Sequence, residues 1–273
     1  SCDAKGVRML LRALREATRK EALEARERPR GDPMARRKER THDRRMAVVT
    51  AVWDQAPKPR TVAMIVDNLR PAPQRELDPR LSQLPRPRNK RVHATLTNNM
   101  PRAIADMFDE AERRDPAHER TWVVLLDGAD EQRDAVEAEA HRRKVRVTIV
   151  TDLLHVLHYL WQAGMALHAG REAEAERWVR RYVEKVLTRP MEDLAAGLRQ
   201  SATLRKLKGT AREAVDECAD YLAKRAPFLE YASALAMGLP IATGVIEGAC
   251  RHLVQDRMGI TGACWDLPMA EAV

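Results

Sequence analysis

The chain has 273 residues, enough to bury a sizeable core in one large domain or two small ones. Its 48 Lys and Arg residues outnumber its 40 Asp and Glu residues, and the resulting net charge of +8 favours a polyanionic partner. No apolar stretch approaches the roughly 20 residues of a membrane span, no secretory signal opens the chain, and neither GxxxxGKS/T nor GxGxxG occurs. These absences predict a cytoplasmic protein that needs no nucleotide cofactor, and cysteines without zinc spacing favour reduced thiols.

The first 45 residues contain few signals for core elements. The chain begins at Ser1-Cys2-Asp3 without an initiator Met, so we expect further residues upstream. Asp3 and Gly6 suit a turn, although Asp3 also suits a short first strand. Mixed charges at helical spacing predict a solvated helix as far as Glu27, where prolines follow. The basic run at 36–40 suits a solvated face or a phosphate contact.

Two β-rich runs, residues 46–53 and 61–66, predict a second and a third strand. Seven prolines among arginines predict a loop over residues 57–90, because that density of proline leaves no core strand. Residues 93–115 predict a helix with a buried apolar face, formed by Met100, Ile104, Met107 and Phe108.

The most informative stretch is residues 122–128, Trp-Val-Val-Leu-Leu-Asp-Gly. A short apolar run bounded by turn residues predicts a strand buried on both faces. Asp127 follows the carboxyl end of this strand, where open α/β sheets bind their ligands, although Asp127 also suits a cap of the next helix. A helix over 129–143 and a strand over 145–150, which is followed by Asp152, extend an α/β sheet of mixed order.

From residue 153 to about residue 236 the apolar spacing is helical, so we expect an all-helical block after the last strand. Gly238-Leu-Pro240 ends this block. A final helix is predicted over residues 245–258, with Ile246, Ala249, Cys250 and Leu253 on one face.

Asp3, Asp127 and Glu247 form a candidate metal site. Two acids on adjacent strands can converge at one edge of a sheet, and a helix packed on the sheet can supply a third. Like charges a few ångströms apart raise one another's pKa. Two divalent cations about 4 Å apart would balance these charges and form a phosphoryl-transfer site. Ligands that are all oxygen favour Mg²⁺ or Mn²⁺ over zinc.

Five motifs occur in order along nearly the whole chain. Cys-Asp-Ala-Lys-Gly-Val at 2–7 is followed by Leu-Arg-Glu-Ala-Thr-Arg-Lys at 14–20, and Ala-Val-Trp-Asp-Gln-Ala-Pro-Lys-Pro-Arg-Thr stands at 51–61. Leu-Leu-Asp-Gly at 125–128 precedes Thr-Asp-Leu-Leu-His-Val-Leu-His-Tyr-Leu-Trp at 151–161. The fifth motif is Gly-Val-Ile-Glu-Gly-Ala-Cys-Arg-His at 244–252, which continues to Met258 and to Thr-Gly-Ala-Cys-Trp at 261–265.

Together these motifs resemble the catalytic core of bacterial insertion-sequence transposases of the ISKra group. The first two resemble the opening of that core, and 125–128 resembles the segment of the second catalytic acid. Residues 151–161 are similar to an Asp/Cys-x-x-His signature that Mutator-like transposases share. Residues 244–265 resemble the segment around the final Glu and are the most specific of the set.

The resemblance implies a ribonuclease H-like mixed sheet with a large all-α insertion before the last core helix. The first part of the catalytic core would occupy residues 1–152, the insertion 153–240, and the last core helix with the C-terminal segment 241–273. The implied activity is DDE transposition, in which Asp3, Asp127 and Glu247 hold two Mg²⁺ (or Mn²⁺) ions for DNA cleavage and strand transfer. The implied partners are DNA ends, target DNA and further copies of the chain, at the nucleoid.

The resemblance also implies DNA-binding or accessory roles for Asp152, His155, Arg251, His252, Arg257 and Trp265. His155 equally suits a structural role among apolar neighbours. Arg251 lies one turn from Glu247, so a salt bridge between them is the alternative to a phosphate contact. Trp265 suits the core better than base stacking.

The chain departs from the family at Cys264, where relatives tend to have Arg, and at its two ends. The segment for recognition of terminal repeats is not in this sequence, and relatives continue beyond Val273. Two alternatives to an active transposase therefore stay open. One is a catalytically dead remnant that only binds DNA or an intact transposase, and the other is a structure-specific nuclease on the same fold.

Overall fold

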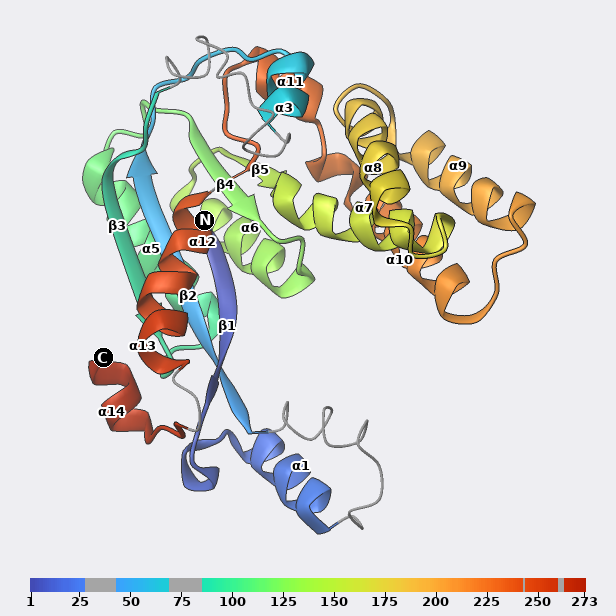
Figure 1. The fold of residues 1–273 in the computed structure, drawn as a ribbon. Helices are drawn as coiled ribbons and strands as arrows, with labels where there is room; N and C mark the ends of the chain where they lie inside the picture. Colours follow the sequence, from blue (N-terminus) through green and yellow to red (C-terminus); the bar gives the residue numbers. More distant parts are fainter. Residues whose placement is uncertain (28–42, 69–84, 243, 260–262) are drawn as a thin grey trace.

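The computed structural model describes residues 1–27, 43–68, 85–242, 244–259 and 263–273 (Figure 1). The fold is mixed α/β, with many helices around small sheets, and its hydrogen-bonded strands have the orders β1-β2-β3 and β4-β5. None of the described helices is long and apolar enough to cross a membrane. All four cysteines are free thiols.

The first sheet is antiparallel. It consists of β1 (Cys2–Arg8), β2 (Arg44–Asp54) and β3 (Arg88–Thr95). In its register Asp3 lies opposite Val49, and Val49 lies opposite Ala94. Asp3 is therefore on a strand, as one of the two sequence interpretations requires, and not in a turn.

The second sheet joins β4 (Trp122–Leu126) to β5 (Val147–Thr151) in parallel. Figure 1 shows β4 beside β1, and the Ser1 hydroxyl donates to the Leu125 carbonyl at 2.9 Å. Arg120, just before β4, pairs with Asp54 at the end of β2 at 3.2 Å. Asp54 lies three residues beyond Ala51, which contacts Ser1, and Arg120 lies before β4 whereas Leu125 lies near its end. Because β2 is antiparallel to β1, β4 therefore runs in the same direction as β1, with Ser1 at the level of Leu125.

Helices cover both faces of the first sheet, because successive side chains of the central strand β2 point to opposite faces and both sets are buried. Val48 belongs to a cluster with α5 (Met100–Arg114) and α6 (Asp130–Arg143). Val49 belongs to a second cluster with the last core helix, which runs as α12 (Gly244–Ala249), a π-helical segment (Cys250–Gln255) and α13 (Asp256–Met258). The predicted core residues Met100, Ile104, Met107 and Phe108 are buried in the first cluster.

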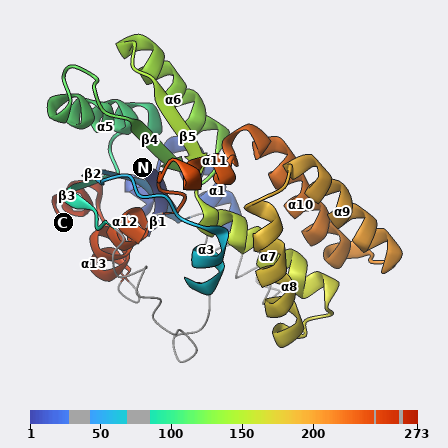
Figure 2. The same ribbon diagram turned by 90° about the horizontal axis from the view of Figure 1, so that it is seen from above.

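A helical block follows β5. It comprises α7 (Leu153–Leu167), α8 (Glu172–Val186), α9 (Met191–Leu204), α10 (Gly209–Arg225) and α11 (Tyr231–Ala236). Figures 1 and 2 both show α7 to α10 gathered beside β4 and β5, away from β3. Leu125 and Val150 share the hydrophobic core of this block, so it packs directly on the second sheet. Further described elements are Leu11–Ala13, α1 (Glu16–Glu27), Ala226–Phe228 and α14 (Leu267–Ala272).

The predicted strand at 61–66 is wrong. The structure has a helix there, α3 (Val62–Asn68), and the Thr61 hydroxyl accepts a hydrogen bond from the Met64 amide at 3.3 Å. Val62, Ile65 and Val66 recur at helical spacing and pack against the helical block. Tertiary packing of that face therefore overrides the β propensity of the branched residues.

Strand β3 was not predicted, and it occupies the end of the expected loop 57–90 and the start of the expected helix 93–115. Six of its eight residues are exposed, since it is the edge strand of its sheet. A polar edge strand carries no apolar alternation to reveal it. The helix begins only at Met100, where Asn99 accepts from the Arg102 amide at 3.0 Å. Residues 69–84 of the loop and the basic run 36–40 lie outside the described residues.

Ser1 is buried, and its main-chain nitrogen donates to the Ala51 carbonyl at 2.9 Å. This contact ties the residue before β1 to β2.

Candidate functional site

Asp3 is held in place on β1 by two hydrogen bonds. One carboxylate oxygen accepts from the Ala4 amide at 2.7 Å, and the other accepts from the Cys250 thiol at 3.3 Å. Burial, assisted by the charge of Asp3, raises the pKa of Cys250 to about 12. The thiol therefore stays protonated at neutral pH and fixes Asp3 against the last core helix.

Asp127 lies in the turn between β4 and α6. Its Oδ1 accepts from the Ala129 amide at 2.8 Å, and its Oδ2 accepts from Gln132 Nε2 at 3.1 Å. The N-cap position of α6 is Ala129, so Asp127 is not the N-cap residue. Asp127 instead stabilises the turn before the helix, two residues ahead of the cap. Gly128 has a φ of 96°, which favours glycine at this position. The carboxylate is half-buried, and its bonds fix its orientation.

Asp3 and Asp127 lie at the same level of neighbouring strands. The contact between Ser1 and Leu125 comes two residues before each acid, and β1 and β4 run in the same direction. Cys2 is near both: burial raises its pKa to about 12, and the charges of Asp127 and Asp3 add to that rise. The structure thus brings two of the three predicted acids to one edge of the two sheets.

Glu247 is carried by the helix that packs over β1. Ile246 and Ala249 bury one face of α12 in the cluster shared with β1 and β2, whereas the Glu247 side chain is exposed. Cys250, one turn further on, contacts Asp3 and has its pKa raised partly by the charge of Glu247. Within the described part of the chain, no three His, Cys, Asp or Glu side chains form a group that could hold a metal ion.

The segment after Glu247 is π-helical, from Cys250 to Gln255, a feature that the sequence spacing did not predict. Its wider turn changes the side-chain partners. Arg251 faces Asp256, five residues on, at 3.7 Å, in place of the predicted pairing with Glu247. His252 also contacts Asp256, at 3.1 Å, and both basic side chains are exposed. Short π-helical segments within helices are frequent at functional sites.

Asp152 and His155 lie where β5 passes into α7. Asp152 is buried and its carboxylate caps α7 by accepting from the Leu154 amide at 2.9 Å. Its own amide donates to the Leu126 carbonyl at 2.8 Å, directly before Asp127. His155 is half-buried in the first turn of α7. Asp152 therefore lies next to the Asp127 turn. Its structural role is to cap the N-terminus of α7.

Arg257 and Trp265 lie at the other end of the last core helix. Arg257 donates to the Val273 carbonyl at 2.6 Å. Trp265 is half-buried against the core cluster, donates from Nε1 to the Met258 carbonyl at 3.0 Å, and its amide donates to the Arg8 carbonyl at 3.0 Å. Its predicted core role is confirmed.

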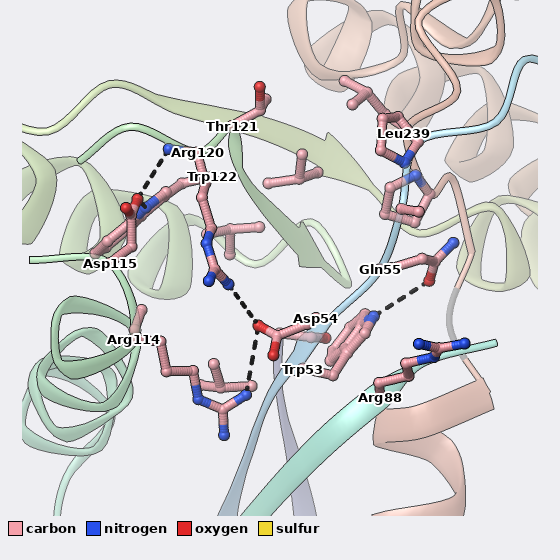
Figure 3. Close-up of a pocket in the computed structure, with 18 of the residues that line it drawn as sticks. Trp53, Asp54, Gln55, Arg88, Arg114, Asp115, Arg120, Thr121, Trp122 and Leu239 are labelled. Atoms are coloured by element: carbon pink, nitrogen blue, oxygen red, sulfur yellow. Dashed lines mark hydrogen bonds and ion pairs between the residues drawn. The ribbon is translucent and has the colours of Figure 1, made fainter. Parts of the chain in front are cut away.

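The sequence did not reveal a cavity of ≈ 830 Å³ at the opposite end of β4, between the end of β2 and α5 (Figure 3). Trp53 and Trp122 contribute to its walls, and among the described residues that line it four arginines outnumber two aspartates. Asp54 is already paired, with Arg114 at 3.8 Å and Arg120 at 3.2 Å. Aromatic walls and an excess of cations suit a flat, anionic group.

Comparison of the chain with protein-family models, with curated protein sequences and with solved structures found no match.

Proposed function

We propose that this chain is the catalytic core of a DDE transposase similar to the ISKra group, which cleaves and transfers DNA strands with the help of metal ions. One observation carries the proposal: Asp3 and Asp127 lie at the same level of neighbouring strands, and the helix that bears Glu247 packs over Asp3 through Cys250. Acids on a first strand, after a later strand and on a last helix also support a ribonuclease H-like core.

The side chains present suit a hard divalent cation in their chemistry. Asp3 and Asp127 offer carboxylate oxygens, which Mg²⁺ and Mn²⁺ prefer, and Glu247 is an exposed carboxylate on the adjacent helix. These three residues would hold the two ions of the proposal. Such ions supply an activated water or DNA 3′-hydroxyl and stabilise the leaving oxygen.

The surrounding residues orient the acids and contact the DNA. The Cys250 thiol and the Ala129 amide fix one oxygen each of Asp3 and Asp127. Arg251 and His252 are exposed on the π-helical segment beside Glu247, where we propose that they contact DNA phosphate. A net charge of +8 supports a polyanionic partner. The proposal includes pairing of copies on the two element ends at the nucleoid.

The test is incubation of the chain with a supercoiled plasmid that carries the DNA flanking its own coding sequence, with Mg²⁺ or Mn²⁺. We expect nicked product that EDTA abolishes, and joining of the 3′-ends to target DNA. Nicking without joining would favour the structure-specific nuclease. DNA binding without nicking would contradict the proposal and favour the non-catalytic remnant.

A further inference from the structure

The helical block contacts the Asp127 turn through Tyr221 of α10. The Tyr221 hydroxyl donates to the main-chain carbonyl of Asp127 at 2.7 Å. Its ring stacks on Tyr159 of α7, with centroids 4.1 Å apart and planes 22° apart. Burial, and next the charge of Asp127, raise the pKa of Tyr221 above its ordinary value, so the hydroxyl remains a donor.

Gly128 allows this close approach. A Cβ atom at Gly128 would lie 2.9 Å from the Tyr221 hydroxyl oxygen and 3.1 Å from Arg225 Nε. Arg225 is buried and pairs with Asp130 in the first turn of α6 at 2.9 Å. Two side chains of α10, one turn apart, therefore contact the turn that presents Asp127.

A second tyrosine fastens the helical block to the neighbouring strand. Tyr231 of α11 donates to the Thr151 carbonyl, the last residue of β5, at 2.7 Å. The block is thus hydrogen-bonded at the carboxyl ends of both β4 and β5, on the edge where Asp127 and Asp152 lie.

We propose that Tyr221, through which the helical block contacts the Asp127 turn, is a positioning residue for Asp127. This inference rests on the proposed function. Gly128 leaves the turn free to rotate, since glycine accepts many backbone conformations. The bond from Tyr221 fixes the Asp127 carbonyl, and with it the turn in which the Ala129 amide orients the carboxylate. Loss of that bond would leave the carboxylate less firmly oriented.

The chain supplies a matched control at Tyr182. This tyrosine also donates to a carbonyl, that of Leu194 at 2.8 Å, and also stacks, on Trp178 with centroids 4.5 Å apart. Its bond lies wholly within the helical block, between α8 and α9. Tyr221→Phe and Tyr182→Phe therefore remove the same chemical group at the two places, and similar falls in Tm show that both variants fold.

Two measurements on the full chain test the inference. We expect Tyr221→Phe to raise hydrogen exchange at the Ala129 amide about tenfold and to lower kcat for plasmid nicking by roughly tenfold or more, with unchanged affinity for DNA. Tyr182→Phe should leave both unchanged. Equal exchange at Ala129 in the two variants would overturn the anchoring, and equal kcat would overturn the catalytic role. A wild-type chain that does not nick overturns the proposed function itself, whereas the exchange result still decides whether Tyr221 anchors the turn.

Discussion

Replacement of Asp127 by Asn should lower the rate of Mg²⁺-dependent DNA nicking by roughly a thousandfold or more, because an amide carries no charge to balance a divalent cation. The fold should survive the change. Asn retains an oxygen that can accept from the Ala129 amide, and the Gln132 amide can turn to donate or accept as required. Gel assays of plasmid nicking, together with circular dichroism, measure both effects.

Asp134→Asn is the matched control for this substitution. Asp134 lies on α6, is exposed and pairs with Arg133 on the surface. The Asp134→Asn variant should nick DNA at the wild-type rate, because it loses only an exposed ion pair, and such pairs contribute little to stability. Glu247→Gln should resemble Asp127→Asn. A variant of either acid that still cuts at the wild-type rate would remove that residue from the site.

The second large effect concerns the core of the helical block. Leu160 of α7 is 0% exposed, so Leu160→Ala should lower the free energy of unfolding by about 2–5 kcal/mol through lost burial and a cavity. The same substitution at Leu204, the last residue of α9, which is 75% exposed, should change it by less than about 0.5 kcal/mol. Urea unfolding compares the two variants.

Leu160 is adjacent to Tyr159, the stacking partner of Tyr221, so its loss should also loosen the Asp127 turn. Equal stability of Leu160→Ala and Leu204→Ala would contradict the packing of the block.

The sequence predicted best those elements whose apolar residues have one clear period. The strand at 122–126 matches β4, because a short apolar run bounded by turn residues is typical of a buried strand, and the charged helix predicted after it matches α6. The helical character of residues 153–236 is confirmed for the same reason. The prediction of a strand at 61–66 failed because branched residues fit a strand and a buried helical face equally well. Contact with the helical block decides which of the two forms.

The candidate site was predictable only in part. An acid after a buried strand suggested Asp127, and Asp3 and Glu247 were suggested by acids near the first strand and on the last helix and then by the resemblance. Nothing in the spacing indicated that Cys250 would donate to Asp3, or that Tyr221, 94 residues beyond Asp127, would hold its carbonyl. Such contacts depend on how helices and strands pack against one another, which the local spacing of residues does not predict. The π-helical turn after Glu247 likewise changes side-chain partners without changing the apolar pattern.

The central claim is that Asp3, Asp127 and Glu247 bind the same pair of divalent ions. Anomalous X-ray scattering from crystals of the full chain grown with Mn²⁺ and DNA tests it most directly. We expect two manganese peaks, ligated by carboxylate oxygens of all three residues. Crystals that contain bound DNA but show no manganese at Asp3 and Asp127, or that leave Glu247 in solvent away from the metal, would contradict the account.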